Sequence, residues 1–172
     1  MRRLWLAFGF AAVTSVASPV LAICDYKGVL NARTSIRQEF ADSKWVVRAR
    51  VLSARDGVFR PNTEDETLWT TYTLRVVHAY KGIPPNTLKF FTERNSGGFY
   101  MDRPWVSLPA GHDVGGEYLL FLTPNPLAKA YAVAKNSVFV NYTCGQSRPW
   151  REVPKSSRQL LERLSKHHRP RT

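Results

Sequence analysis

Short stretches in which apolar side chains occupy every second position dominate the chain and predict a mostly β protein. The clearest stretch covers about residues 45–53. A longer one, 68–80, is rich in Thr, Tyr and Val and ends before the breakers Gly82 and Pro84. Four shorter apolar runs predict further strands at about 88–92, 118–123, 130–133 and 138–142.

Two short helices are predicted to flank these strands. The first covers about residues 35–41. The second begins at Ser156, which we expect to cap it, and places Leu160, Leu161 and Leu164 on one apolar stripe. The elements together predict an all-β fold with flanking short helices.

The expected architecture is a closed antiparallel barrel of five strands, of the oligonucleotide/oligosaccharide-binding (OB) type. A β-sandwich is the alternative. No internal repeat or linker is visible. We therefore expect one domain over 23–155, followed by a basic C-terminal helix and tail over 156–172.

Residues 1–22 have the composition of a signal peptide, with two arginines before an apolar run and small residues before the cleavage site. A membrane anchor is disfavoured because polar residues and Pro19 interrupt a run that is short for a span. Lipidation of Cys24 is disfavoured because Ile23 stands where a lipoprotein box needs a small residue. We expect an exported protein, periplasmic or secreted.

The chain has two cysteines, Cys24 and Cys144, and export predicts that they form a disulfide. Free thiols that serve metal binding are the alternative, but the chain has no CxxC motif and no nearby histidine cluster. Closing a loop of about 120 residues stabilises a fold by at most roughly 4–5 kcal/mol.

The chain is strongly basic, with 25 Lys and Arg residues against 13 Asp and Glu and a formal net charge of +12. Such a balance attracts polyanions. For an exported protein these are anionic envelope polymers, lipid head groups or acidic protein faces, and we expect no nucleic acid partner.

Four segments carry a further pattern: Phe40 to Val51, Tyr72 with Tyr80-Lys81-Gly82, Gly116-Glu117-Tyr118-Leu119-Leu120, and Cys144 with Pro149-Trp150. In this order and spacing they resemble landmarks of the tissue inhibitors of metalloproteinases, whose inhibitory domain is netrin-like. The resemblance covers nearly the whole mature chain. It implies an OB-type barrel with a cysteine-stapled N-terminal segment along its edge, and a zinc metalloprotease as partner.

The chain departs from that family at the N-terminal residues by which the family inhibits proteases. The family begins with Cys-x-Cys, and its first residue chelates the protease zinc through a free amine and a carbonyl. Cys24 matches the second of those cysteines, the first falls on Ala22, and its disulfide partner is missing from 95–98. Inhibition by zinc chelation is therefore disfavoured.

No catalytic residue, metal ligand or cofactor is predicted, and we expect a non-enzymatic protein. His112-Asp113 and nearby Ser107 lie in a predicted loop, where adjacency in sequence is no evidence for a catalytic triad. His78 lies within a predicted strand, where a packed or surface histidine is the simpler interpretation.

The segment 99–105 combines aromatic side chains, Met and Arg, the composition of protein-binding hot spots. Plugging of the barrel end by Phe99 and Trp105 is the alternative. In the resembling family this segment lies beside the N-terminal edge, which predicts one continuous docking ridge. Its residues are Ile23, Cys24, Asp25, Tyr26, Phe99, Tyr100, Arg103 and Trp105.

Two functions follow from these observations. The first is a module, expected to be monomeric, that binds another exported protein through this ridge. The second is an envelope-associated module that binds an anionic polymer or lipid through its basic surface and tail.

Overall fold

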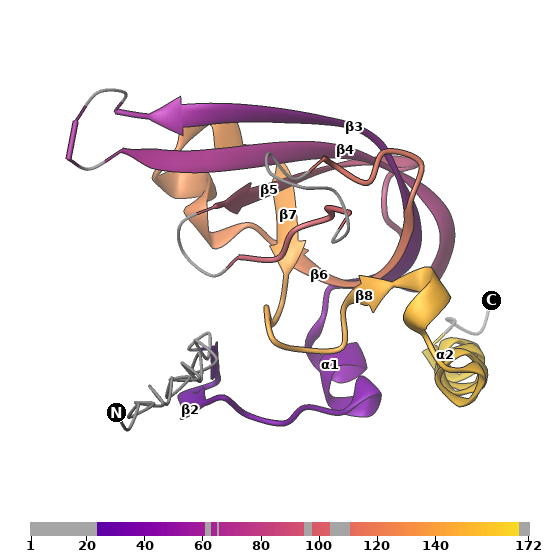
Figure 1. Cartoon of the computed structure of the whole chain (residues 1–172). Helices are drawn as coiled ribbons and strands as arrows, with labels where there is room; N and C mark the ends of the chain where they lie inside the picture. The colour runs from indigo at the N-terminus through magenta and orange to yellow at the C-terminus, as the bar shows by residue number, and fades with distance from the viewer. Residues whose placement is uncertain (1–23, 61–62, 65, 95–97, 104–110, 169–172) are drawn as a thin grey trace, which may run out of the picture.

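The computed structural model describes residues 24–60, 63–64, 66–94, 98–103 and 111–168, and the expected signal peptide lies outside these ranges. Within them the protein is mostly β, with a six-stranded mixed sheet, a two-stranded sheet and two α-helices (Figure 1). The six strands are β3 (Trp45–Phe59), β4 (Thr67–Lys81), β5 (Thr87–Glu93), β6 (Glu117–Pro124), β7 (Ser137–Val140) and β8 (Arg148–Pro149).

Five of these strands pair in a ring, in the order β3, β4, β5, β7, β6 and back to β3. The first of them, β3, joins the two sides of the ring because it pairs with both β4 and β6. Val47, for example, lies opposite Ala79 on one side and Leu120 on the other. The strand β8 extends the sheet beyond β6.

The expectation of a wholly antiparallel ring is wrong. The strands β5 and β7 run parallel, with Lys89 opposite Ser137, whereas every other pair in the ring is antiparallel. The physical reason is the odd number of strands. Directions can alternate around a closed ring only when the number of strands is even, so a ring of five must contain a parallel pair.

The pairing of β3 with β4 is irregular in register, which helps β3 to pair with a second neighbour. The pairing with β4 shifts between Val46 and Val47, between Arg48 and Ala49, and between Val51 and Ser53. Such bulges bend and twist a strand locally. The N-terminal part of β3 is therefore shared by β4 and β6, while its last residues pair with β4 in a long hairpin.

Side chains from all five ring strands form the main hydrophobic core. Its buried members are Val47, Ala49, Val51, Tyr72, Leu74, Leu88, Phe90, Met101, Tyr118, Leu120, Leu122, Val138 and Val140. The alternation expected for residues 45–53 is confirmed in its first half, because Val47, Ala49 and Val51 are all buried.

Both predicted helices are present and pack on the outer face of β3, β4 and β6. The helix α1 (Ile36–Asp42) begins at Ser35, whose side chain caps Gln38. The helix α2 (Lys155–His168) begins before Ser156, because the carbonyl of Pro154 accepts the first helical hydrogen bond; the expected cap at Ser156 is therefore wrong, since this residue lies within the helix. A second core joins them to the sheet: Phe40, Val46, Tyr80, Leu119, Phe121, Val153 and Leu161.

The strand predicted at 130–133 is wrong. These residues belong to a segment with two short 3₁₀ helices, Pro126–Lys129 and Ala132–Ala134. A four-residue apolar run does not distinguish a strand from a packed turn. Here the apolar side chains cover the outer face of the sheet, where Tyr131 stacks on Phe59 with ring centroids 4.2 Å apart.

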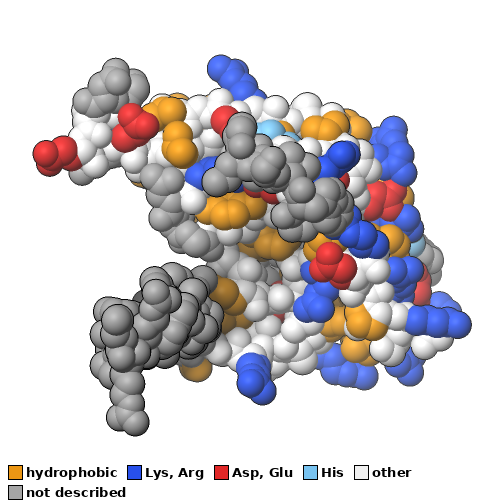
Figure 2. Space-filling view, in the orientation of Figure 1, with side chains coloured by type: hydrophobic (Ala, Val, Ile, Leu, Met, Phe, Trp, Pro, Cys, Tyr) orange, Lys and Arg blue, Asp and Glu red, His pale blue; other side chains and the backbone are white. Residues whose placement is uncertain are grey.

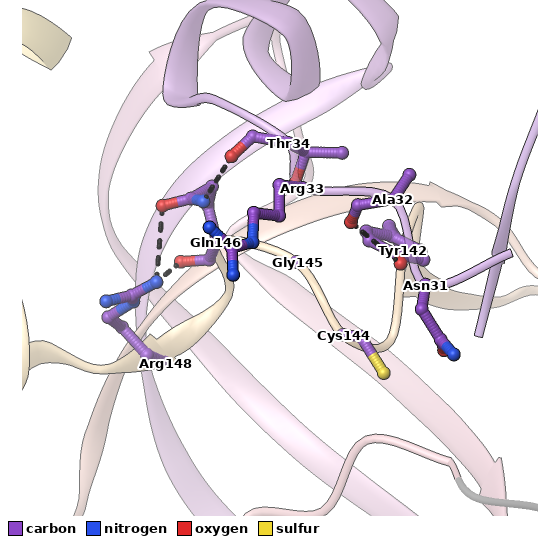
Figure 3. A pocket seen from close by; sticks show the side chains of 9 residues that line it. All are labelled: Asn31, Ala32, Arg33, Thr34, Tyr142, Cys144, Gly145, Gln146 and Arg148. Carbon is purple, nitrogen blue, oxygen red and sulfur yellow. Dashed lines mark hydrogen bonds between the residues drawn. The ribbon is translucent and has the colours of Figure 1, made fainter. Parts of the chain in front are cut away.

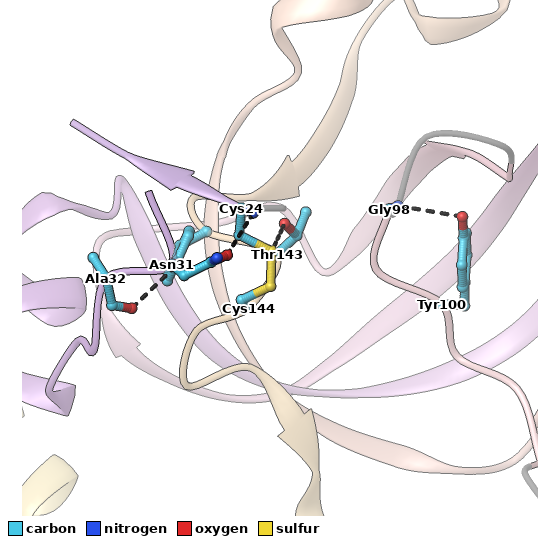
Figure 4. The surroundings of a disulfide bond; sticks show 8 residues. Cys24, Asn31, Ala32, Gly98, Tyr100, Thr143 and Cys144 are labelled. Atoms are coloured by element: carbon cyan, nitrogen blue, oxygen red, sulfur yellow. Dashed lines mark hydrogen bonds between the residues drawn. A yellow bond between two sulfur atoms is a disulfide. The ribbon is translucent and has the colours of Figure 1, made fainter. Parts of the chain in front are cut away.

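The predicted disulfide between Cys24 and Cys144 is confirmed, with Cα atoms 6.0 Å apart. It ties the N-terminal segment to the loop that follows β7. Cys24 is buried, and the hydroxyl of Thr143 lies 3.4 Å from its sulfur (Figure 4).

Replacing both cysteines by alanine is expected to lower the free energy of unfolding by about 2–4 kcal/mol, because the unfolded chain regains the freedom of a loop of 120 residues. Urea denaturation of the double variant measures this loss. A change below about 0.5 kcal/mol would show that the staple contributes nothing to the fold.

Candidate functional site

The N-terminal segment forms a small hairpin that exposes apolar side chains. The strands β1 (Asp25–Tyr26) and β2 (Val29–Leu30) pair across a turn at Lys27 and Gly28, both at positive φ. A carboxylate oxygen of Asp25 accepts the N–H of Gly28. Val29 and Leu30 remain 58% and 65% exposed, which is unusual for two adjacent aliphatic side chains held in a strand.

Hydrogen bonds close this hairpin and fix the segment that follows it to the body of the protein. Asn31 bonds twice to Cys24: its side-chain oxygen accepts the Cys24 N–H at 3.1 Å, and its N–H donates to the Cys24 carbonyl at 2.6 Å. Tyr142 donates its hydroxyl to the carbonyl of Ala32 at 3.0 Å. The Gln146 side chain donates to the carbonyl of Thr34 at 2.7 Å (Figure 3).

A cavity of about 540 Å³ lies between this anchored segment and the loop after β7 (Figure 3). Its lining includes Tyr142, Cys144 and Gln146, together with the two cations Arg33 and Arg148. Figure 3 shows both arginines at the Gln146 end of the cavity, away from Cys144. The site therefore combines an apolar edge with a cationic recess.

A buried carboxylate lies beneath the cavity. Glu39 of α1 is fully buried; one of its oxygens accepts the Gln146 N–H at 2.8 Å and the Thr34 hydroxyl, while the other has no hydrogen-bond partner among the described residues. Position 145 needs glycine, since a Cβ there would collide with this carboxylate. Burial raises the pKa of Glu39, although these hydrogen bonds oppose the rise.

The segment 98–103, which belongs to the second part of the predicted ridge, is held against the ring of strands. Met101 is fully buried in the core, and the Tyr100 hydroxyl bonds to the carbonyls of Glu93 and Arg94. The ring of Phe99 lies 6.2 Å from that of Phe90 and packs on the core. This contact fits the alternative interpretation, in which Phe99 plugs the end of the barrel.

A connected polar cluster fixes the same segment. Asp102 accepts from Arg94 at 2.6 and 3.1 Å and from the Tyr72 hydroxyl at 3.0 Å. The two ring nitrogens of His112 lie 3.0 Å from Asp102 and 2.9 Å from Asp56 of β3. Burial raises the pKa of Asp102, but the bonds from Arg94 and His112 outweigh it and hold that pKa below its usual value.

The cluster does not form a catalytic triad with the residues described. Both nitrogens of His112 face carboxylates, so neither is left to activate a hydroxyl. Asp113 instead accepts from Tyr118 at 3.0 Å and from Arg103 at 3.2 Å. Ser107 lies outside the described residues. No group of three metal-binding side chains occurs in the described parts of the chain.

The structure describes six of the eight ridge residues, and Ile23 and Trp105 lie outside the described ranges. Asp25 is exposed, Tyr26 is half-buried and donates to Asp42, and Arg103 pairs with Asp113. No bond or ring contact joins the described parts of the two segments, and Figure 4 shows Tyr100 well apart from the disulfide. The continuous ridge stays a prediction.

The residues that build the recess were not predicted from the sequence. Asn31, Glu39, Tyr142 and Gln146 carry no motif, and they come together only through the disulfide and the hydrogen bonds around it. Gly145 beside Cys144 was the one available signal for a close approach of two segments.

Comparison with known proteins adds no assignment: no protein-family model matches the chain, and no curated protein is significantly similar to it. Among the helices described, none has the length and apolar character to cross a membrane.

Asp102→Asn is expected to lower the free energy of unfolding by about 2–3 kcal/mol at neutral pH, because Arg94 and His112 lose the charge they face. The loss should shrink as the pH falls through the lowered pKa of Asp102, where the wild type also loses this charge. Glu152→Gln is the control, since its exposed pair with Arg151 contributes about 0–1 kcal/mol. Urea denaturation against pH measures both, and equal losses would contradict the prediction.

Glu39→Gln is expected to stabilise the protein at pH 8, because it removes a buried charge and keeps an oxygen for Gln146. The pKa of Glu39 is raised in the folded protein, and this fixes the direction of the pH dependence. The contribution of Glu39 to stability is full below its pKa in the unfolded chain and is lost as the pH rises through its pKa in the folded protein. The gain should therefore vanish as the pH is lowered. Thermal unfolding from pH 8 to pH 4 measures it, and a gain independent of pH would contradict this account.

Proposed function

We propose that this chain is an exported, non-enzymatic protein-binding module that docks another exported protein at its N-terminal edge. The observation that carries the proposal is the exposure of Val29 and Leu30 on a hairpin that a disulfide and paired hydrogen bonds hold in place. An apolar edge fixed before binding loses little conformational entropy when it docks.

The adjoining recess indicates the chemistry of the partner. Arg33 and Arg148 line the cavity beside the apolar edge. A partner segment that presents an aliphatic or aromatic side chain next to a carboxylate complements both features. A zinc metalloprotease is the partner class that the family resemblance implies.

Docking of this kind does not depend on chelation of a protease zinc. The chelating amine and carbonyl of the family belong to its first cysteine, which this chain lacks, and the backbone N and O of Cys24, which matches the second cysteine, are both bonded to Asn31. We therefore propose recognition by surface complementarity, with Tyr26 and the exposed pair Val29 and Leu30 in contact with the partner.

We also propose that the ring is a five-stranded OB-type barrel of the netrin-like kind. Three consecutive antiparallel strands, β3 to β5, are followed by β6, which returns to lie beside β3, as in a Greek key. Export is supported by the disulfide, because such bonds persist in oxidising compartments.

A second candidate function is binding of an anionic envelope polymer or lipid. It is favoured by the Lys and Arg side chains that gather on the side of the molecule carrying α2 (Figure 2). High salt would abolish such binding, whereas docking of the apolar edge would largely survive it.

A photo-crosslinking amino acid at position 30 tests the docking edge in the host that exports the protein. Leu30 should give a discrete adduct with one partner. The same substitution at Ile83, which is 94% exposed between β4 and β5, is the matched control and should give none. Adducts of equal yield from both positions, or none from position 30, would overturn the proposal.

Once that partner is purified, Leu30→Asp should weaken its binding at least about tenfold, since a charge enters an apolar contact. Ile83→Asp should leave the affinity unchanged. Calorimetric titration in 0.5 M salt measures both and removes the contribution of general charge attraction.

A further inference from the structure

A second cavity, of about 290 Å³, lies away from the docking edge on the outer face of β3, β4 and β5. Its volume is near the lower end of the range for ligand sites, which begins at about 300 Å³. Figure 1 shows the segment of the two 3₁₀ helices beside these strands, and Val133 of that segment contributes to the cavity wall.

The strand register arranges the cavity residues in two adjacent rungs. In the first, Thr73 of β4 lies between Ser53 and Lys89, and in the second Thr71 lies beside Arg55. Three hydroxyls thus form a floor, with a cation on each flanking strand. The backbones of β3 and β5 are about 10 Å apart across β4, so both long side chains can reach one anion above it.

Two polar atoms of the cavity residues are buried and have no hydrogen-bond partner: the indole Nε1 of Trp69 and the hydroxyl Oγ1 of Thr71. Buried polar groups are nearly always paired in native proteins, so each unpaired one needs an explanation. A donor and a hydroxyl left unsatisfied in one cavity indicate that a polar ligand completes them.

No hydrogen bond or ion pair joins either cation, Arg55 or Lys89, to another described residue. The nearby Arg94 and His112, in contrast, are paired with Asp102 and Asp56. None of the residues that line the cavity is acidic. The site therefore favours an anion.

The indole of Trp69 is not available for stacking. One face lies on the backbone of Gly57, where a Cβ would collide with the ring. Its other neighbours are the rings of Phe59 and Phe91, at 6.0 and 6.1 Å. Proteins that bind single-stranded nucleic acid stack bases on exposed aromatic faces, so this arrangement disfavours a nucleobase and leaves only the N–H edge of Trp69 for a ligand.

We infer that this outer-face cavity binds an acidic sugar residue. The sugar hydroxyls bond to Ser53, Thr71 and Thr73 and to the Trp69 N–H, and the anionic group lies between Arg55 and Lys89. The long side chains of these two cations swing aside to admit the sugar to the buried Nε1 and Oγ1 atoms. The site is independent of the docking edge, which lies on different residues.

Titration with glucuronic acid, followed by ¹H–¹⁵N NMR, tests the inference. The Trp69 indole signal, assigned by its loss in Trp69→Phe, should shift and saturate. Arg55→Gln with Lys89→Gln should weaken binding at least tenfold. Glucose 6-phosphate in a parallel titration shows whether a carboxylate or a phosphate is preferred, and either preference supports the site. Glucose alone should bind at least tenfold more weakly than the acid.

The matched control is Arg163→Gln with Lys166→Gln, which removes the same charge from the exposed face of α2. It should leave the affinity unchanged. Equal weakening by both double variants would show general charge attraction and overturn the inference. So would acetate or inorganic phosphate binding as tightly as the sugar acids, or an indole signal that does not move. Leu30→Asp should not alter this titration, so its outcome is separate from that of the docking edge.

Discussion

The fold depends on the double pairing of β3. One strand supplies hydrogen-bonding partners to β4 on one side and to β6 on the other, and this shared strand turns a sheet with two open edges into a ring. Three irregularities in its register supply the bend that the closure requires. The main core follows from it, because side chains of five strands can meet only after the ring has closed. An open sheet of the same strands would leave Val47 and Leu120 facing solvent.

Closure also leaves an outer face that the ring itself cannot bury, and different segments cover different parts of it. The two helices cover parts of β3, β4 and β6 with a second apolar core, while the 3₁₀ segment covers β3 and β5 through Tyr131. Beyond Tyr131 this segment covers the outer face only in part, and the residues of the sheet there carry hydroxyls and cations in place of apolar side chains. The proposed sugar site is the part of the outer face that no segment of the described chain seals.

The stapled hairpin and the polar cluster around Asp102 hold two surface segments rigid by different means. The hairpin relies on a covalent bond and on hydrogen bonds around Asn31, since its own apolar side chains point to solvent. The segment 98–103 relies on the burial of Met101 and on the ion pair of Asp102 with Arg94, which directly follows β5; Asp102 also contacts His112, whose ring reaches Asp56 of β3. Both arrangements hold a surface segment in one conformation, and for the hairpin this is what the proposed docking requires.

The sequence by itself determined the strands of the ring, because alternate side chains such as Val47, Ala49 and Val51 are buried, but it wrongly predicted a further strand at 130–133. It also determined the two helices, at 35–41 and at the leucines of α2, and it determined the disulfide, because the chain has two cysteines and these can pair in only one way. A closed ring of five strands was also expected from the sequence, but its parallel pair, the recess over Glu39 and the outer-face cavity were decided only by the tertiary structure. Each brings together residues from separate elements, such as Glu39 with Gln146 or Arg55 with Lys89, and no local pattern records which strands become neighbours.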